Sequence, residues 1–270
     1  MNVIPIDSGR DPRLADYLGV REPARLVERG QLIAEGRFVV RRLLEQGRLA
    51  VRSLLLNPAA LGALGDAIGR HAPHADVFVI PSQAFVAATG FTLHRGCLAL
   101  AGRPVPAAMD GLLAAARVVV VLERIVDADN IGGIFRNAEA FGADGVLLGP
   151  GCCDPFYRKA IRTSSGATCV VPHALATPWP DVLDAVRAAG FTVVATTPET
   201  PAASIGEFVR TPAARGRVAV LVGTEGHGLS AGALSRADLR VRIPMAGALD
   251  SLNVATAAGI VLQRLSELRR

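Results

Sequence analysis

The sequence predicts an α/β protein of two domains, of which the C-terminal one has a mostly parallel sheet. The chain has 270 residues, more than one domain usually needs, and half of them are apolar, which is enough for a sizeable core. From residue 117 onward, short continuous apolar segments alternate with segments of helical periodicity, as in sheets that helices cover on both faces. Pro104 and Pro106 mark a break, because proline continues neither a helix nor a central strand. We therefore expect domains over 1–106 and 117–270, joined by a linker over 107–116.

The first hundred residues are expected to form a compact mixed α/β module. Apolar residues recur at helical spacing from Leu26 to Leu44, which predicts helix there. A short helix is predicted to begin at Ser82, with Phe85 and Ala88 facing inward. Runs rich in β-branched, leucine and aromatic residues, bounded by turn residues, predict three strands: 51–56, 76–80 and 96–100.

In the second half, predicted strands and helices alternate. A helix over 109–116 is expected to join the domains, and the strand over 118–122 has the apolar character of a strand that is buried on both faces. The next helix, over 130–141, has its apolar residues on one side and ends at Gly142. Further strands are predicted at 145–148, 191–195, 218–222 and 239–243, and further helices at 179–189 and 254–268.

Composition argues against membrane, secreted and metal-binding classes. No apolar segment is long enough to cross a bilayer, and the N-terminus lacks the features of a secretory signal, so a cytoplasmic location is predicted. His71 and His74 flank a proline and share no helix face, so no metal site is expected. The cysteines form no Cys-x-x-Cys pattern and are expected to be reduced thiols: Cys97, Cys152, Cys153 and Cys169.

Positive charge is concentrated in the first half. The formal net charge is +5, of which residues 1–105 carry +4 and residues 106–270 carry +1. Ten arginines lie between Arg10 and Arg52, and guanidinium groups pair bidentately with phosphates. The first half is therefore predicted to face an anionic partner, although a solvated arginine-rich surface explains the same pattern. Arg158, Lys159 and Arg162 are predicted to form a second basic surface, on a helix face, that can guide phosphates.

Three polar or glycine-rich segments, 129–138, 223–229 and 243–254, carry the motifs of the second half. The first two each follow a predicted strand, and the third begins where another ends, so all three can converge on one crevice of an open α/β sheet. No G-x-G-x-x-G lies between the first strand and helix of this domain, which argues against a dinucleotide site. Ser251 and Asn253 can also simply cap the helix that follows them.

Together and in this order, the three segments resemble the motifs of the SpoU/TrmH branch of the SPOUT RNA methyltransferases. The resemblance runs from about residue 117 to the C-terminus. The first half is similar, more loosely, to the L30e-like substrate domain of many rRNA-directed members, through Glu35-Gly36 and the Thr92–Gly96 turn. The matched positions are Asn130, Gly132, Arg136 and Ala138; Gly223, Glu225 and Gly228; Ile243, Pro244 and Met245; and Ser251, Leu252, Asn253 and Val254.

The resemblance implies an L30e-like α/β domain followed by a SPOUT domain with a mostly parallel sheet and a deep trefoil knot. It implies transfer of methyl from S-adenosylmethionine to a ribose 2′-hydroxyl of RNA, without a metal, by a homodimer formed through the catalytic domain. Ribosomal RNA is the expected substrate, because tRNA-directed relatives usually lack the extra domain. The alternatives are a tRNA 2′-O-methyltransferase and a catalytically inactive RNA-binding protein of ribosome assembly.

The resemblance also implies the roles of individual residues. On the acceptor side, the arginine that matches Arg136 has been proposed in the family as the base. A phosphate clamp that orients the ribose is physically easier, because a guanidinium does not readily give up a proton. An ion pair of Arg136 with Glu139, an N-cap role for Asn130 and a tight turn at Gly223 and Gly228 are the structural alternatives. The implied catalytic residues are Arg136, Ser251 and Asn253, supported by Asn130 and Glu225, and the implied cofactor-binding residues are Thr196, Gly223, Gly228, Ile243 and Leu252.

Overall fold

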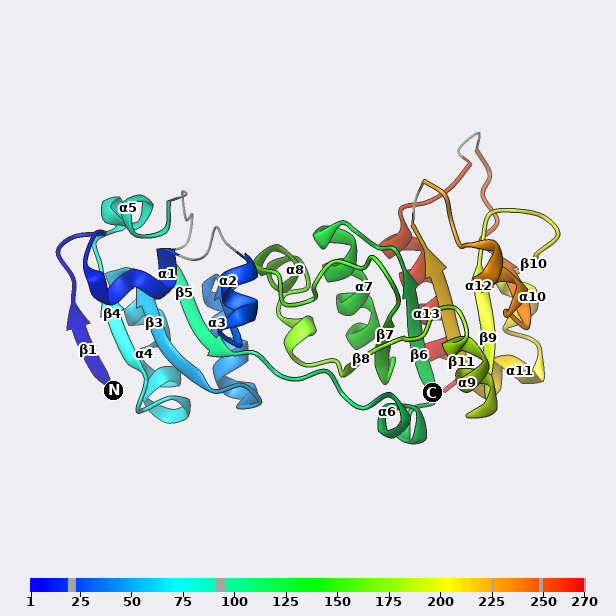
Figure 1. The fold of residues 1–270 in the computed structure, drawn as a ribbon, viewed down its shortest axis with the longest axis horizontal. Coiled ribbons are helices and arrows are strands. Elements are labelled where there is room, and N and C mark those ends of the chain that lie inside the picture. Colours follow the sequence, from blue (N-terminus) through cyan, green and yellow to red (C-terminus); the bar gives the residue numbers. More distant parts are fainter. Residues whose placement is uncertain (19–22, 91–95, 225, 248–249, 270) are drawn as a thin grey trace. The chain divides into compact units, whose positions relative to one another are not determined.

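The computed structural model describes residues 1–18, 23–90, 96–224, 226–247 and 250–269. The chain divides into two compact units (Figure 1). Unit 1 contains Met1–Val105 and Phe156–Val170, and unit 2 contains Pro106–Pro155 and Val171–Arg270. The chain therefore passes between the units three times. The Thr92–Gly96 turn of the sequence analysis lies, except for Gly96, outside the described residues.

Unit 1 is built on a mixed five-stranded sheet in the order β1-β4-β3-β5-β2. Both β1 and β3 run parallel to β4, whereas β5 is antiparallel to β3 and to β2. The three strands predicted in this half are confirmed as β3, β4 and β5, and two further strands, β1 and β2, were not predicted. The bounds are β1 Asn2–Pro5, β2 Gln31–Glu35, β3 Val51–Leu56, β4 Asp76–Val79 and β5 Cys97–Gly102.

The prediction of helix from Leu26 to Leu44 was wrong in its middle. The segment forms α2 (Pro23–Glu28), then strand β2, then α3 (Arg37–Gln46). Gly30 and Gly36 have φ of 60° and 95°, a backbone conformation that ends a helix, and they bracket β2. All five residues of β2 are buried, including the polar Gln31 and Glu35 at its ends, so its apolar centre is only three residues long and shows no alternation that would distinguish it.

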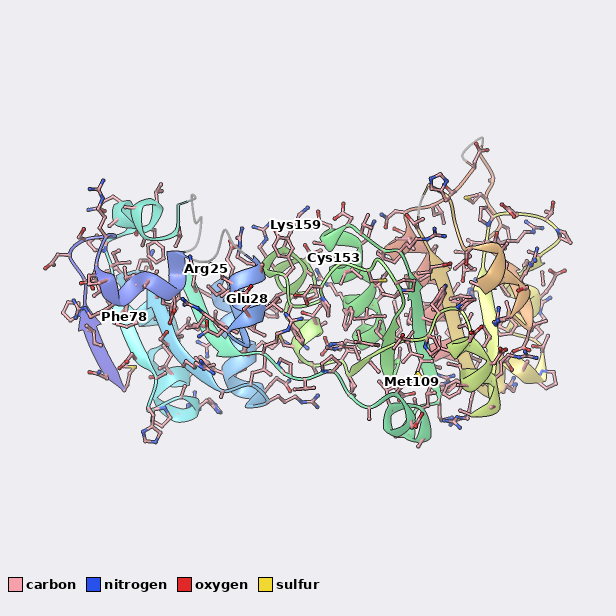
Figure 2. All side chains as sticks on the ribbon, in the orientation of Figure 1. Arg25, Glu28, Phe78, Met109, Cys153 and Lys159 are labelled. Carbon is pink, nitrogen blue, oxygen red and sulfur yellow. The ribbon has the colours of Figure 1, made fainter. Side chains whose placement is uncertain are left out.

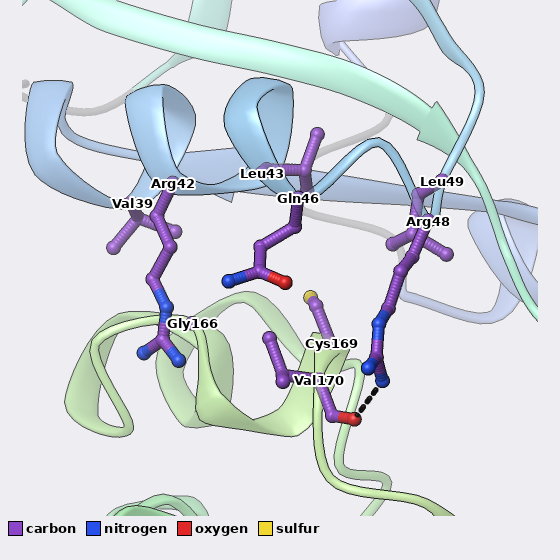
Figure 3. A pocket seen from close by; sticks show the side chains of 9 residues that line it. All are labelled: Val39, Arg42, Leu43, Gln46, Arg48, Leu49, Gly166, Cys169 and Val170. Carbon is purple, nitrogen blue, oxygen red and sulfur yellow. Dashed lines mark hydrogen bonds between the residues drawn. The ribbon is translucent and has the colours of Figure 1, made fainter.

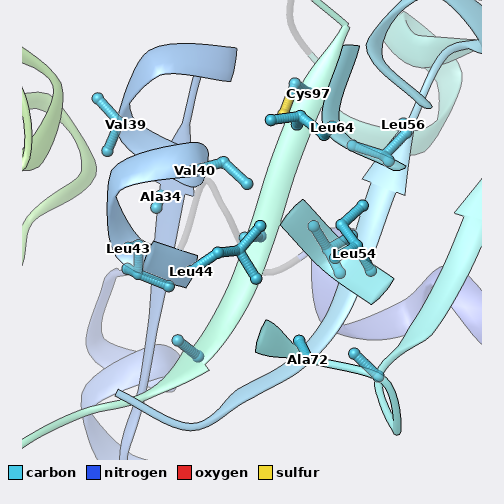
Figure 4. Packing of buried hydrophobic residues seen from close by; sticks show 14 of the residues in the cluster. Ala34, Val39, Val40, Leu43, Leu44, Leu54, Leu56, Leu64, Ala72 and Cys97 are labelled. Carbon is cyan, nitrogen blue, oxygen red and sulfur yellow. The ribbon is translucent and has the colours of Figure 1, made fainter. Parts of the chain in front are cut away.

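Two apolar cores lie in unit 1. One includes Leu44 of α3, Leu54 of β3 and Leu64 of α4 (Pro58–His71), as Figure 4 shows. The other includes Tyr17, Phe78 and Phe85; Figure 2 labels Phe78.

The short helix that was predicted from Ser82 is confirmed as a 3-10 turn, Ser82–Ala84, that continues into α5. The remaining helices of unit 1 are the 3-10 turn Pro12–Leu14, α1 Ala15–Leu18, α5 Phe85–Thr89, α8 Arg158–Thr163 and the 3-10 turn Ala167–Cys169.

The segment Phe156–Val170 packs into unit 1, although the sequence analysis placed it in a continuous second domain. Phe156 and Ile161 are buried in the core beside α3 and α4. Figure 3 shows the turn after α8 facing α3, with the Arg48 guanidinium donating to the Val170 carbonyl at 2.7 Å. The cavity enclosed there, about 10 Å³, holds no more than one water. Buried apolar side chains therefore assign this segment to unit 1.

Unit 2 is built on a seven-stranded sheet in the order β10-β12-β9-β11-β6-β7-β8, and every neighbouring pair is parallel. In the centre, Val120 of β6 lies opposite Val220 of β11 on one side and Val146 of β7 on the other. The predicted strands are confirmed, and β8 and β10 were not predicted. The bounds are β6 Val118–Glu123, β7 Gly145–Leu148, β8 His173–Leu175, β9 Phe191–Thr196, β10 Ala203–Ser204, β11 Arg217–Gly223 and β12 Leu239–Arg242.

The helices of unit 2 confirm the predicted alternation, with one change at the expected linker. Helix α6 buries Leu112 and Leu113 in the core of unit 2, so residues 109–115 belong to that unit and are not a free linker. The Arg217 side chain bonds the carbonyl groups of Leu113, Ala116 and Ala189 at two helix ends. The bounds are α6 Met109–Ala115, α7 Ala128–Ala140, α9 Val182–Ala188, α10 Ile205–Phe208, α11 Pro212–Arg215, α12 Ala231–Ser235 and α13 Val254–Glu267.

Within the described ranges, none of the helices is both long and apolar enough to cross a membrane. All four cysteines are free thiols. Burial raises the pKa of Cys97 and of Cys169 to about 12. Both side chains lie in or against the core that α3 and α4 cover.

We predict that Cys97 and Cys169 resist a thiol reagent in the folded protein. The thiolate is the reactive form, and a pKa near 12 leaves a thiolate fraction of about 10⁻⁴ at pH 8. Alkylation at pH 8 followed by peptide mass spectrometry should find both thiols unmodified, and alkylation in guanidinium chloride should modify both. Rapid modification of Cys97 in the native protein would contradict this packing.

Candidate functional site

A cavity of about 320 Å³ lies in unit 2, at the carboxyl ends of β9, β11 and β12. Since these strands are parallel neighbours, the segments that follow them meet at one edge of the sheet (Figure 1). The first turn of α13 completes the wall through Val254 and Ala257. Six residues selected from the sequence line the cavity together: Thr196, Gly223, Gly228, Ile243, Ser251 and Leu252.

Gly223 is required by a close approach of the backbone. A Cβ atom there would lie 2.6 Å from the carbonyl carbon and oxygen of Gly228 and 2.7 Å from the Leu229 nitrogen. Gly228, with a φ of 62°, donates its N–H to the Thr224 carbonyl at 2.9 Å and closes the turn. The tight-turn alternative therefore holds for both glycines, and both also line the cavity. The space beside Gly223 is filled by the protein's own backbone.

The Thr196 hydroxyl is a polar group at the cavity that the protein leaves without a bond. Its Oγ1 is buried and has no hydrogen-bond partner among the described residues. The next residue, Thr197, differs, because its hydroxyl accepts the Glu199 N–H at 3.1 Å. A buried hydroxyl without a partner costs free energy, and because this oxygen is covered by protein atoms, a ligand in the cavity can bond it only after the Thr196 side chain rotates.

Asn253 joins α13 to α7. Its Oδ1 accepts the N–H groups of Ala255 and Thr256 at 3.0 and 3.1 Å, which makes Asn253 the N-cap of α13. These two donors fix the orientation of the amide, so Nδ2 donates to Asn130 Oδ1 at 2.8 Å. Asn130 is not the N-cap of α7, since Asp127 has that position. Nor does Ser251 cap α13. The capping alternative thus applies to Asn253 alone.

Helices α7 and α13 are packed without room for one more methyl group at two places. A Cβ on Gly133 would lie 2.8 Å from Ala255 Cβ, and a Cβ on Gly259 would lie 2.7 Å from Asn137 Nδ2. Asn137 donates from this Nδ2 to the Ala255 carbonyl at 2.7 Å. This contact sets where α13 begins relative to α7, and hence the distance between Asn130 and Asn253.

Arg136 and Ser251 remain available to a ligand. Arg136 is exposed on α7, does not line the cavity, and forms no hydrogen bond or ion pair with any residue that the structure describes. The alternative of an ion pair with Glu139 is therefore not observed. Ser251 is exposed and lines the cavity. Glu225 lies outside the described residues, so its role stays a prediction.

Glu123 supports this region and was not selected from the sequence. It ends β6 and is buried, with 2 % of its surface exposed. Its carboxylate accepts the Trp179 indole N–H at 2.9 Å and the Ser230 backbone N–H at 2.8 Å. The second bond fixes the chain just after the 224–228 turn. The sequence signal was available, because an acidic residue at the end of a buried strand requires partners.

The cavity also contains charged or titratable side chains that the sequence analysis did not select: Glu199, His227 and Asp250. The first two belong to segments that follow β9 and β11. Across the described part of the chain, no group of three or more His, Cys, Asp and Glu side chains is arranged to hold a metal ion.

Comparisons with known proteins agree with this geometry. The SpoU rRNA Methylase family model matches residues 117–263. An uncharacterized tRNA/rRNA methyltransferase of Mycobacterium tuberculosis is 40% identical over 255 residues, which cover 93% of this chain and 87% of that protein. The 23S rRNA (guanosine(2553)-2'-O)-methyltransferase RlmP of Bacillus subtilis is 34% identical over 153 residues, 57% of this chain and 59% of that protein. The solved structure of an AdoMet-bound rRNA methyltransferase from Sinorhizobium meliloti has a TM-score of 0.78 at 25% identity, covering 98% of both chains.

We predict that Gly133→Ala destabilises unit 2, whereas Gly111→Ala does not. The added methyl at position 133 would overlap Ala255, and such overpacking costs about 1–3 kcal/mol. No atom lies within 4 Å of a Cβ at Gly111 in α6, so the same substitution there should raise stability by up to about 1 kcal/mol. Urea unfolding measures both. Equal stability of the two variants would show that the α7–α13 contact can relax.

Proposed function

This chain belongs to the SpoU rRNA methylase family, and from that membership we propose that it methylates a ribose 2′-hydroxyl of RNA, with ribosomal RNA as substrate and S-adenosylmethionine as methyl donor. One observation carries the proposal: the five implied cofactor positions and Ser251 line one cavity at the ends of parallel strands. The names of two relatives support it. RlmP is a 23S rRNA 2'-O-methyltransferase, and the Sinorhizobium meliloti structure is an AdoMet-bound rRNA methyltransferase.

The cavity fits a molecule of the size of S-adenosylmethionine. About 320 Å³ lies within the range of small-molecule sites. Gly223 and Gly228 bring main-chain groups to the wall, and Thr196, whose covered hydroxyl has no partner among the described residues, also lines the cavity. When bound, S-adenosylmethionine supplies a methyl group on a sulfonium, which is already activated for displacement by an oxygen nucleophile. The protein is thus left with the tasks of alignment and of exclusion of water.

The acceptor side is assigned to Arg136, Ser251 and Asn253, with Asn130 in support. Because Oδ1 of Asn253 accepts two N–H groups of α13, this residue acts by positioning and not as a base. The Ser251 hydroxyl, which lines the cavity, can bond the ribose. The Arg136 guanidinium has no partner among the described residues, and its planar fork suits a phosphate clamp that orients the ribose.

Three further parts of the proposal rest on the family resemblance. Unit 1 is an L30e-like domain that supplies RNA affinity, unit 2 contains the trefoil knot, and two chains associate through unit 2. Removing the N-terminal region to test the first part would expose Phe156 and Ile161, which are buried in unit 1. The full chain is therefore the right object for RNA-binding measurements, and sedimentation at micromolar concentration tests the dimer.

The proposal is tested by incubating the full chain with methyl-labelled S-adenosylmethionine and separate rRNA and tRNA pools. We expect label in rRNA, at a nucleotide whose 3′ phosphodiester resists alkali because its 2′-hydroxyl is methylated. Arg136→Ala should bind the cofactor and transfer no methyl. Label in tRNA would contradict the substrate assignment, label on a base would contradict the ribose assignment, and no label in either pool would contradict the activity.

We predict that Thr196→Val weakens S-adenosylmethionine binding about 2- to 10-fold, the effect of one lost hydrogen bond. Valine has the shape of threonine without the hydroxyl, which has no described partner in the protein, so folding stability should not fall. Thr192→Val, in the same strand but outside the cavity, is the matched control. Calorimetry measures both variants. Unchanged cofactor affinity in Thr196→Val would show that the ligand does not use this hydroxyl.

We predict that Asn253→Ser slows methyl transfer at least about 10-fold while cofactor affinity changes little, because the bond to Asn130 is lost and the ribose contact is misplaced. Serine caps helices about as well as asparagine, so stability should change by less than about 0.5 kcal/mol. Asn57→Ser is the matched control, since Asn57 caps α4 through the same kind of bond. Full activity in Asn253→Ser would show that Asn253 only caps α13 and does not position the ribose.

A further inference from the structure

Phe38 is an aromatic side chain that unit 1 leaves in solvent. Its surface is 62% exposed, and among the large apolar residues that are exposed in the described part of the chain it is the one aromatic. It lies in the first turn of α3, on the side of the helix away from the buried Val40 and Leu44. Burying a phenylalanine is worth about 1.5–3 kcal/mol, so a solvated ring at this place contributes little to the fold.

Arginines surround Phe38 on two elements. Arg37 precedes it, is exposed, and forms no hydrogen bond or ion pair with any residue that the structure describes. Arg41 and Arg42 follow at the i+3 and i+4 positions, which share its helix face. We call this set, together with Arg158 and Arg162 of α8, the Phe38 surface.

Glu35, at the end of β2, connects this strand to α8 through ion pairs. Together with its two arginine partners it has a net charge of +1. Its carboxylate pairs with both Arg158 and, at 3.5 Å, Arg162. The Glu35 side chain is 11% exposed, whereas that of Arg162 is 51% exposed. The acidic group is therefore covered, and positive charge faces the solvent next to Gly36. Glu45, an acidic residue of α3, is paired with Arg41 at 3.4 Å.

We propose that the Phe38 surface binds an unpaired stretch of the RNA substrate, with a base stacked on the Phe38 ring and the neighbouring phosphates held by Arg37 and Arg162. This inference rests on the proposed function for the identity of the nucleic acid. An exposed aromatic among arginines is the arrangement that captures single-stranded RNA, because unpaired bases offer a flat face and the backbone offers phosphates. A duplex hides the faces of its bases, so it fits the arginines but not the ring.

The test measures binding of the full chain to a single-stranded RNA oligonucleotide, and to the same strand in a duplex, by fluorescence anisotropy at one fixed salt concentration. We expect Phe38→Ala to weaken single-strand binding about 5- to 150-fold, the effect of one lost base stack, and to leave duplex binding unchanged. Phe38→Tyr should restore affinity and Phe38→Leu should not. Val86→Ala in α5, another exposed apolar residue of unit 1, is the matched control and should bind like the wild type.

Salt dependence separates the two kinds of contact. Arg37→Gln should reduce the slope of log Kd against log salt concentration by about 0.7, the value for one phosphate of a single strand, and Phe38→Ala should leave the slope unchanged. Unchanged single-strand affinity in Phe38→Ala, restoration by leucine, or an equal loss on duplex would overturn the inference. An unchanged melting temperature shows that each variant is folded.

The outcomes distinguish this inference from the proposed function. Methyl transfer by the wild type together with unaltered RNA binding by Phe38→Ala overturns the inference and leaves the activity standing. Suppose instead that the wild type transfers no methyl, while Phe38→Ala loses single-strand binding and keeps duplex binding. This result would support RNA binding by the Phe38 surface and contradict the proposed activity. Undetectable binding of the wild type to the single strand overturns the inference.

Discussion

The contact between α7 and α13 is the constraint on which the site depends. Two glycines, Gly133 and Gly259, let the helices approach until a further methyl group would overlap the opposite side chain. That approach brings the start of α13 to α7, where Asn253 caps its own helix and bonds Asn130. Since residues on either side of Asn253 line the cavity, the same contact that packs the helices also sets one wall of the site.

The interactions described around the site hold groups in place. The cavity is lined by glycines, hydroxyl side chains and apolar side chains together with Glu199, His227 and Asp250, and the Asn253 amide oxygen accepts two N–H groups at the start of α13. Such a site suits a reaction whose donor is already activated, because alignment then supplies most of the rate. Among the described residues, neither the Arg136 guanidinium nor the Ser251 hydroxyl has a hydrogen-bond partner, and the proposed function assigns both groups to the RNA.

The segment Phe156–Val170 belongs to unit 1, although in the chain it lies between two parts of unit 2. It follows β7 of unit 2, yet its apolar residues lie in the core of unit 1, and its arginines pair with Glu35 there. Substitutions in α8 therefore act first on unit 1. The Phe38 surface joins residues that are more than a hundred positions apart in the chain, and its positive charge depends on how α8 packs against β2 and α3.

The sequence by itself determined the parallel sheet of unit 2 and six of the residues that line the cavity. Val118–Glu123 and its neighbours are continuous apolar runs, and the ends of parallel strands must meet at one edge, so the motifs could be placed without a structure. Tertiary structure alone decided the rest. A five-residue strand with a three-residue apolar centre looks like part of a helix, as at β2, because so short a segment shows no period of two. The bond between Asn130 and Asn253, the backbone beside Gly223 and the place of residues 156–170 are contacts between distant parts of the chain, which local pattern does not encode.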